Sequence, residues 1–188
     1  NTGVVGDVGS GVTMFASGDR VVSNGKHAEV VSVPMNLCAK IPDDVSDDEA
    51  AFTVIGAIAL QGIRLAQPNL GESVVVTGLG LVGLITIQLL KANGMKVIGI
   101  DVDDKKCRLA ESFEVETINS LNHNPVKSVI SLTDNIGADG VIITAATNSN
   151  DIISRWIRSL VNKDKINLFR PENIFDFIYS KDTASGIT

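Results

Sequence analysis

Residues 73–83 read Ser-Val-Val-Val-Thr-Gly-Leu-Gly-Leu-Val-Gly. The β-branched run Ser73–Thr77 predicts a buried strand, and the glycines after it predict a tight turn. The mostly apolar residues that follow predict a helix as far as about Ala92, where Asn93-Gly94 supplies a left-handed C-cap. A strand, a glycine-rich turn and a helix in this order are typical of the first unit of a parallel α/β sheet.

The same alternation of strand and helix continues toward the C-terminus. After a strand at 96–100 that ends at Asp101, the expected elements are a helix at 104–112, a strand at 115–118, a helix at 125–133, a strand at 140–145 and a helix at 151–161. Such an alternation implies right-handed crossovers between parallel strands. The predicted fold class is α/β, a Rossmann-type parallel sheet with helices on both faces.

Residues 1–45 have a different pattern, in which short strands alternate with turns. Asn1–Val5 reads like the middle of a strand, and Arg20–Val22 and Ala28–Val31 have strand composition. This part therefore predicts a small β segment ahead of the α/β domain.

A helical segment is expected from residue 47 to residue 66. Ser46 and Glu49 form a capping box at its start, in which each side chain can bond the other residue's backbone N–H. Gly56 is a point at which this segment can break. At the other end of the chain, five of the eight aromatic residues lie within the last 33 positions. They predict a short terminal helix that docks on the rest of the chain or, alternatively, offers an apolar patch to a partner subunit.

Composition narrows the function classes. The chain is 44% hydrophobic and 20% charged, which is typical of a globular protein, and its net charge of -6 argues against a nucleic-acid partner. The longest apolar stretch, Val74–Leu90, is interrupted by glycines and polar residues and falls short of a bilayer span, so no membrane partner is expected. The two cysteines, Cys38 and Cys107, form no Cys-x-x-Cys pair, and a cytoplasmic location is expected.

The glycine turn predicts a dinucleotide site because it lies between a strand and a helix. Gly78 permits the tight turn, Gly80 lets a pyrophosphate approach the backbone, and Gly83 lets the helix lie close to the sheet. Free N–H groups and about half a positive charge at the helix N-terminus favour bound phosphates.

Asp101 completes this motif at the end of the next strand. It lies 23 residues after Gly78, close to the spacing of about 20 that is expected of a ribose ligand. Its carboxylate can accept bonds from the ribose hydroxyls and would repel the 2′-phosphate of NADP, and no arginine follows at once. The sequence therefore favours NAD over NADP. The alternative is a parallel-sheet domain that merely uses a glycine-rich turn.

With these residues the sequence resembles the medium-chain dehydrogenase/reductase family, the relatives of zinc-type alcohol dehydrogenase. The resemblance covers residues 1–150, and residues 39–101 are most similar to the dehydrogenase half of two-part bacterial oxidoreductases thought to serve surface-polysaccharide synthesis. The matching blocks are Gly18–Val22, Ala39–Asp43, Glu49–Ala51 and Gly71–Gly83, followed by Asp101. The resemblance divides the chain into a partial GroES-like β segment (1–45), a Rossmann NAD-binding domain (46–162) and a C-terminal tail with a short helix (163–188).

The resemblance also implies roles for individual residues. Asp101 would bind the ribose, and Lys106 matches a lysine that flanks the adenosine. The residues lining the pyrophosphate turn would be Gly78, Gly80, Leu81, Val82 and Gly83, and those near the nicotinamide would be Thr144, Ala145 and Ala146.

The zinc ligands of this family do not transfer. Residues 1–45 resemble only the later part of the GroES-like barrel, so the first ligands would fall outside the chain. The remaining zinc cysteine would fall at Thr53, and threonine is a poor zinc ligand. The family's multi-cysteine lobe is replaced by Ser23–His27. No bound zinc is therefore expected.

The resulting hypothesis is a zinc-independent, NAD-dependent oxidoreductase that transfers hydride between NAD and a small alcohol or carbonyl substrate. A homo-oligomer is expected, and no catalytic acid or base can be named. Lys165–Leu168 resembles the family's late return to the barrel, so the chain is expected to be a fragment, a decayed gene product or a shortened variant. The alternative is a catalytically incomplete NAD-binding remnant or regulatory module.

Three further side chains have simpler interpretations. His27 stands where the family has an aromatic residue and is expected to pack, whereas His123 lies in a polar loop and is expected to be solvated. Cys107 is expected to be a small buried apolar residue.

Overall fold

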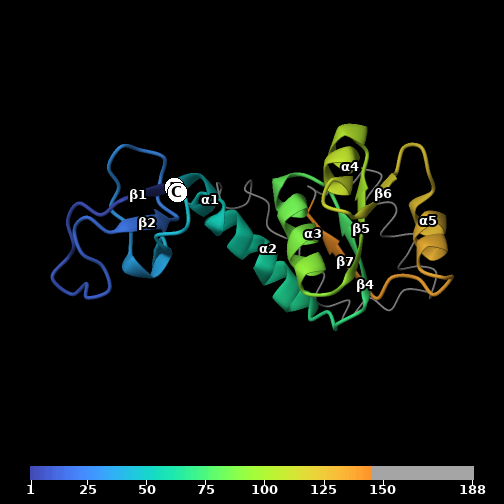
Figure 1. Cartoon of the computed structure of the whole chain (residues 1–188), viewed down its shortest axis with the longest axis horizontal. Coiled ribbons are helices and arrows are strands. Elements are labelled where there is room, and N and C mark those ends of the chain that lie inside the picture. Colours follow the sequence, from blue (N-terminus) through green and yellow to red (C-terminus); the bar gives the residue numbers. More distant parts are fainter. Residues whose placement is uncertain (145–188) are drawn as a thin grey trace, which may run out of the picture. The chain divides into compact units, whose positions relative to one another are not determined.

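A computed structural model describes residues 1–144 of the chain. The chain divides into two compact units, Asn1–Ile58 and Ala59–Thr188 (Figure 1). The helix predicted at 151–161 and the terminal helix lie outside the described residues. Within residues 1–144, no helix has the length and apolar character that crossing a membrane requires.

The first unit contains a small antiparallel sheet with the strand order β1-β2-β3. Val22 and Ile41 are buried with Ala50, and Val45 and Val54 pack against them. This sheet fits the expected partial GroES-like segment. Its elements are β1 (Thr2–Val4), β2 (Arg20–Ser23), the 3-10 helix η1 (Met35–Leu37), β3 (Cys38–Lys40), α1 (Asp47–Ala50) and the first residues of α2 (Thr53–Ala66).

Two predictions for this unit were wrong. Residues 28–30 form bends and Val31 has no regular structure, so no strand forms here, and Val30 is 87% exposed. Strand composition alone does not fix a strand, because strand stability depends on packing against neighbours. The helical segment is interrupted at Ala51-Phe52, between the end of α1 and the start of α2. It is not interrupted near Gly56, which lies inside α2.

The predicted capping box is confirmed. The Ser46 hydroxyl accepts a hydrogen bond from the Glu49 backbone N–H at 3.2 Å, and the Ser46 N–H donates to the Glu49 carboxylate at 2.9 Å. Arg20 links β2 to the start of α1 by two hydrogen bonds. Its guanidinium donates to the Val45 carbonyl at 2.9 Å and to the Asp47 carboxylate at 2.8 Å.

The second unit is a parallel sheet of four described strands in the order β6-β5-β4-β7. Apart from the rest of α2, its elements are β4 (Ser73–Thr77), α3 (Leu81–Ala92), β5 (Lys96–Asp101), α4 (Asp104–Glu111), β6 (Glu116–Asn119), α5 (Pro125–Leu132) and β7 (Gly140–Ile143). The predicted strands and helices match within about two residues. The chain adds β5 and β6 on one side of β4 and β7 on the other, so a topological switch point lies at β4.

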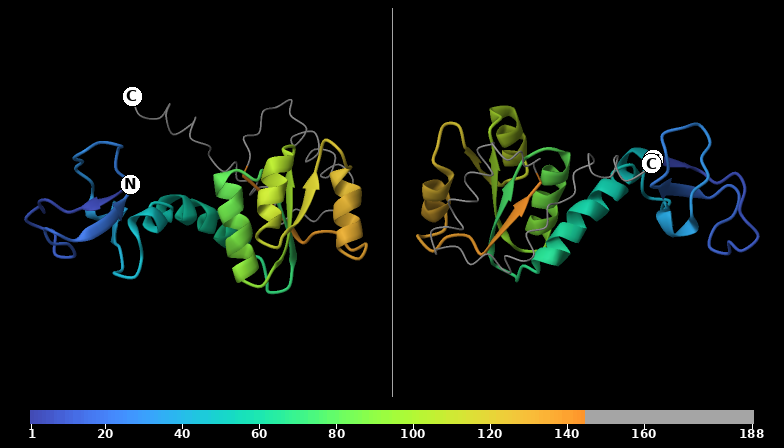
Figure 2. Two further views of the ribbon diagram at one scale, coloured as in Figure 1. Left: turned by 45° about the horizontal axis from the view of Figure 1, so that its top comes forward. Right: turned by 180° about the vertical axis from the view of Figure 1, so that it is seen from behind.

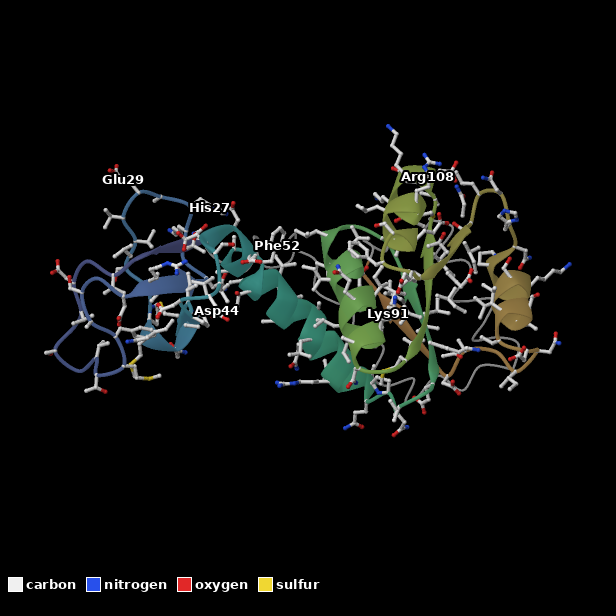
Figure 3. The ribbon with its side chains drawn as sticks, viewed as in Figure 1. His27, Glu29, Asp44, Phe52, Lys91 and Arg108 are labelled. Atoms are coloured by element: carbon white, nitrogen blue, oxygen red, sulfur yellow. The ribbon has the colours of Figure 1, made fainter. Side chains whose placement is uncertain are left out.

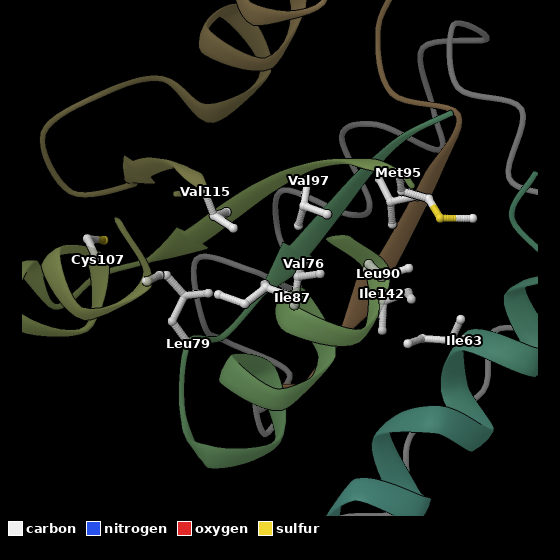
Figure 4. Packing of buried hydrophobic residues seen from close by; sticks show 12 residues of the cluster. Ile63, Val76, Leu79, Ile87, Leu90, Met95, Val97, Cys107, Val115 and Ile142 are labelled. Atoms are coloured by element: carbon white, nitrogen blue, oxygen red, sulfur yellow. The ribbon is translucent and has the colours of Figure 1, made fainter. Parts of the chain in front are cut away.

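Helices cover both faces of this sheet, as predicted (Figure 2). On one face, Ile87 and Leu90 of α3 and Cys107 of α4 pack with Val76 and Val97 of the strands (Figure 4). On the other face, Val129 of α5 packs with a second set of buried residues, namely Val75, Ile98, Ile100 and Ile118. Burial on both faces explains why β4 has three consecutive valines, Val74–Val76, instead of alternating apolar and polar residues.

Candidate functional site

The glycine turn joins β4 to α3 at the switch point of the sheet. Gly78 has φ +89°, which side chains rarely adopt, and its backbone N–H donates to the Ile100 carbonyl at 2.8 Å. Gly80 is exposed and is the N-cap of α3, and a Cβ added there would meet no atom within 4 Å. The turn is therefore sharp at its first glycine and open to solvent at its second.

Gly83 is needed for a closer contact than the sequence suggested. A Cβ added at this buried position would lie 1.9 Å from the Gly78 carbonyl oxygen and 2.8 Å from the Thr144 Oγ1. The helix thus packs against the turn that precedes it. This packing requires glycine at position 83, because the atom opposite is backbone and cannot rotate away.

The N-terminus of α3 is suited to an anion. Leu81 is exposed and Val82 is half-buried, and the first turn of the helix carries no acidic residue. The first backbone N–H groups of a helix have no partner within the helix, and its dipole places partial positive charge there. Gly80 has no side chain that could cover them.

Asp101 lies at the end of β5, with only 6% of its surface exposed. One carboxylate oxygen, Oδ2, accepts a hydrogen bond from the Leu79 N–H at 2.7 Å. The other, Oδ1, accepts from the N–H groups of Val102 at 2.8 Å and Asp103 at 3.0 Å. These bonds compensate the cost of burying the charge. Asp101 therefore joins the end of β5 to the glycine turn, a role that its spacing in the sequence did not predict.

Lys106 extends from the first half of α4 toward this carboxylate. Its Nζ lies 3.7 Å from Asp101 Oδ2, and its side chain is 47% exposed. An ion pair this long and this exposed contributes little to stability. The ammonium group is therefore free to contact a ligand that reaches Asp101.

Thr144 follows β7 directly and contacts the same turn. Its Oγ1 donates to the Gly78 carbonyl at 2.6 Å, and its backbone N–H donates to the Thr77 carbonyl at 2.9 Å. The structure therefore brings Thr144, Asp101 and Lys106 to the glycine turn. Ala145 and Ala146, the other residues expected near the nicotinamide, lie outside the described residues.

The remaining candidate side chains lie elsewhere. Cys107 is buried, as predicted, and burial raises the pKa of its thiol, as does the negative charge of Asp101. The thiol is thereby kept protonated and unreactive at neutral pH. His27 is exposed, so the packing role expected of it was wrong (Figure 3). His123 is exposed as well, which confirms its solvated position.

A metal site needs several ligating side chains close together. Among residues 1–144, no three His, Cys, Asp or Glu side chains are grouped so that they could hold a metal ion. Thr53 is the first residue of α2. The side chains of residues 1–144 alone therefore do not fit a zinc centre.

The sequence matches a known protein family. Residues 82–166 match the family model described as zinc-binding dehydrogenase. This range begins in the first turn of α3 and includes Asp101, Lys106 and Thr144.

Relatives and solved structures give the same assignment. The chain is 35% identical over 150 residues to D-guloside 3-dehydrogenase of Escherichia coli K12, which covers 76% of this chain and 43% of that protein. The alcohol dehydrogenase of Thermus sp. ATN1 aligns with a TM-score of 0.76 and 26% identity, over 83% of this chain and 56% of that one. A mycobacterial protein solved in complex with NADPH aligns with a TM-score of 0.65 and 31% identity, over 74% of this chain and 47% of that one.

These matches are partial on the side of the relatives. The chain spans 37% to 43% of the length of the first curated relatives it matches. What those larger proteins do as a whole therefore does not transfer directly to this chain.

Proposed function

We propose that this chain, which belongs to the medium-chain, zinc-type dehydrogenase family, binds NAD at its glycine turn and is the nucleotide-binding part of an oxidoreductase. One observation supports the proposal most directly. Gly80 and the N-terminus of α3 lie at the switch point of the sheet, and the buried Asp101 bonds the same glycine turn there. Ligands of open parallel sheets bind at such points, beyond the carboxyl ends of the strands.

The geometry supports separate contacts to the diphosphate and to the adenosine half of the dinucleotide. The open space at Gly80 and the first N–H groups of α3, which have no partner within the helix, would receive the diphosphate. Asp101 would accept bonds from the adenosine ribose, with Lys106 beside the adenosine. Residues 46–162 would then form the nucleotide-binding domain and residues 1–45 the partial GroES-like segment.

NAD is favoured over NADP by the charge around the ribose position. Asp101, Asp103 and Asp104 all lie at the junction of β5 and α4, where the 2′-phosphate of NADP would bring further negative charge. Lys105 and Lys106 follow in the same helix and reduce this repulsion only in part, because about half of the Lys106 side chain is exposed to solvent, which screens its charge. NADP is therefore expected to bind, but more weakly.

We expect calorimetric titration of the purified chain to give a Kd for NAD about tenfold or more below that for NADP. Such a ratio corresponds to about 1.4 kcal/mol, a reasonable value for one unfavourable charge contact at a solvated site. Equal or tighter NADP binding would refute the NAD preference. Binding of neither cofactor would refute the dinucleotide site itself.

The bound nicotinamide would accept or donate the hydride, with a small alcohol or carbonyl compound as its partner. The chain's own residues would bind and orient the cofactor, and none of those described is assigned as the catalytic acid or base. A steady-state assay with NAD and a panel of alcohols separates the oxidoreductase from its alternative, because NAD binding without turnover would indicate a catalytically incomplete or regulatory module. The homo-oligomer and the cytoplasmic location stay predictions.

Zinc independence is the second part of the proposal. It rests on Thr53, which stands where the family resemblance places a cysteine, and on the lack of a ligand cluster among residues 1–144. We expect metal analysis of the dialysed protein to find far less than one zinc per chain, and EDTA to leave the Kd for NAD unchanged. One zinc per chain that survives dialysis would contradict this, and the Thr53→Cys variant shows whether a thiolate at that position is sufficient to retain the metal.

A further inference from the structure

We infer that Thr144 is a positioning residue that, together with Asp101, holds the Gly78–Leu79 peptide from its two ends. The inference rests on the proposed dinucleotide site and assigns Thr144 a different role from the nicotinamide contact that the family resemblance implies. We call this arrangement the peptide clamp, meaning the Gly78–Leu79 peptide with the side chains of Asp101 and Thr144.

The clamp consists of two hydrogen bonds to one peptide group. The Gly78 carbonyl accepts from Thr144 Oγ1 at 2.6 Å, and the Leu79 N–H donates to Asp101 Oδ2 at 2.7 Å. The carbonyl and the N–H of a planar trans peptide point in opposite directions. Two bonds on opposite sides therefore fix the plane of this peptide against rotation.

The strand order of the sheet places the two side chains. Thr77, the last residue of β4, is paired with Ile100 of β5 on one side and with Ile143 of β7 on the other. Asp101 and Thr144 are the residues that follow these partners, so they flank the position that follows Thr77. The clamp is therefore a consequence of the switch point, at which strands on both sides of β4 end at the same level.

Fixing this peptide matters because it begins at a glycine, whose backbone has more conformational freedom than that of other residues. Gly78 has φ +89° and no side chain to restrict it. Its orientation sets the path of the chain into Gly80 and the first N–H groups of α3. A turn that is already ordered before the ligand arrives loses less entropy on binding, which increases affinity.

The Thr144 hydroxyl is the only part of its side chain that the clamp requires. Thr144→Ser keeps this hydroxyl, whereas Thr144→Val keeps the shape of the side chain and leaves the Gly78 carbonyl without this donor. Comparing these two variants therefore separates the effect of the hydrogen bond from the effect of side-chain packing.

The decisive experiment compares NAD with ADP-ribose, which has the diphosphate and both riboses but no nicotinamide. If Thr144 positions the turn, Thr144→Val raises the Kd for both ligands by the same factor, about tenfold for the loss of one good hydrogen bond, and Thr144→Ser restores both to within about threefold. Weaker binding of NAD alone would overturn the inference, since Thr144 would then contact the nicotinamide. Unchanged binding of both ligands would overturn it as well.

Amide hydrogen exchange tests the clamp without any ligand. In the unmodified protein the Leu79 amide should exchange as slowly as the amides of β4, and exchange as fast as that of exposed Gly80 would overturn the clamp. Thr144→Val should speed Leu79 exchange about tenfold and lower the free energy of unfolding by about 1 kcal/mol, and Thr144→Ser should restore both. If neither NAD nor ADP-ribose binds the unmodified protein, the proposed function fails, and the exchange rates still decide on the clamp.

Discussion

Gly83→Ala is expected to destabilise the second unit and to abolish measurable NAD binding. The added Cβ would lie 1.9 Å from the Gly78 carbonyl oxygen, so either α3 or the turn must move. Replacing a helical glycine by alanine normally stabilises a helix by about 1 kcal/mol, whereas overpacking costs about 1–3 kcal/mol. Because the clash here is between backbone and Cβ and no side chain can rotate away, we expect the cost to prevail by about 2 kcal/mol.

Urea unfolding and calorimetric NAD titration measure the two effects of this substitution. Gly56→Ala is the matched control, because Gly56 is also a helical glycine and a Cβ there would meet no atom within 4 Å. That control should be as stable as the unmodified protein or more so. A Gly83→Ala protein with unchanged stability and unchanged NAD affinity would show that the close contact between α3 and the turn is not as described.

Gly80→Ala separates the effect on stability from the effect on NAD binding. Gly80 has φ −76° and ψ −169°, a backbone conformation that alanine adopts without strain, and the space around it is open. The methyl group should therefore leave stability unchanged and obstruct only the approaching diphosphate. A stable Gly80→Ala protein with lost NAD affinity would place the ligand at the turn, whereas retained affinity would contradict that placement.

The second unit could be predicted from the sequence because its signals are local. The buried run of β4, the glycine turn and the Asn93-Gly94 cap each act over a few neighbouring residues. The capping box at Ser46 was found for the same reason. The first unit was harder to predict. Residues 28–31 have strand composition but pair with no strand of the described residues, and β3 lies in a segment with no clear strand pattern.

The parts of the site that could not be predicted depend on contacts between distant residues. The bond from Thr144 to Gly78 joins residues 66 positions apart, and the bond from Asp101 to Leu79 joins residues 22 apart. Both depend on which strands flank β4 and on their register. Local composition carries no information on either. The motif predicted the ligand-facing role of Asp101 from its spacing, but its role in holding the turn becomes apparent only from the assembled sheet.

This second role of Asp101 leads to the other large effect, that of Asp101→Asn. We expect this substitution to lower the free energy of unfolding by about 2 kcal/mol and to weaken NAD binding about thirtyfold or more. Both carboxylate oxygens accept hydrogen bonds from backbone N–H groups, on one side from Leu79 and on the other from Val102 and Asp103. An asparagine side chain has only one acceptor oxygen, so in either orientation its NH₂ group faces a backbone donor.

Asp103→Asn is the control that isolates this effect from the loss of one negative charge. Asp103 is the N-cap of α4, where its side chain accepts a hydrogen bond from the Lys105 N–H at 2.8 Å, and asparagine caps a helix about as well as aspartate. Both variants lose one charge at the junction of β5 and α4, so both should narrow the difference between NAD and NADP. Only Asp101→Asn should also lower the unfolding free energy and speed exchange of the Leu79 amide. If the two variants were equally stable and bound NAD equally well, Asp101 would contribute nothing beyond its charge. That result would contradict both the ribose contact of Asp101 and its role in fixing the glycine turn.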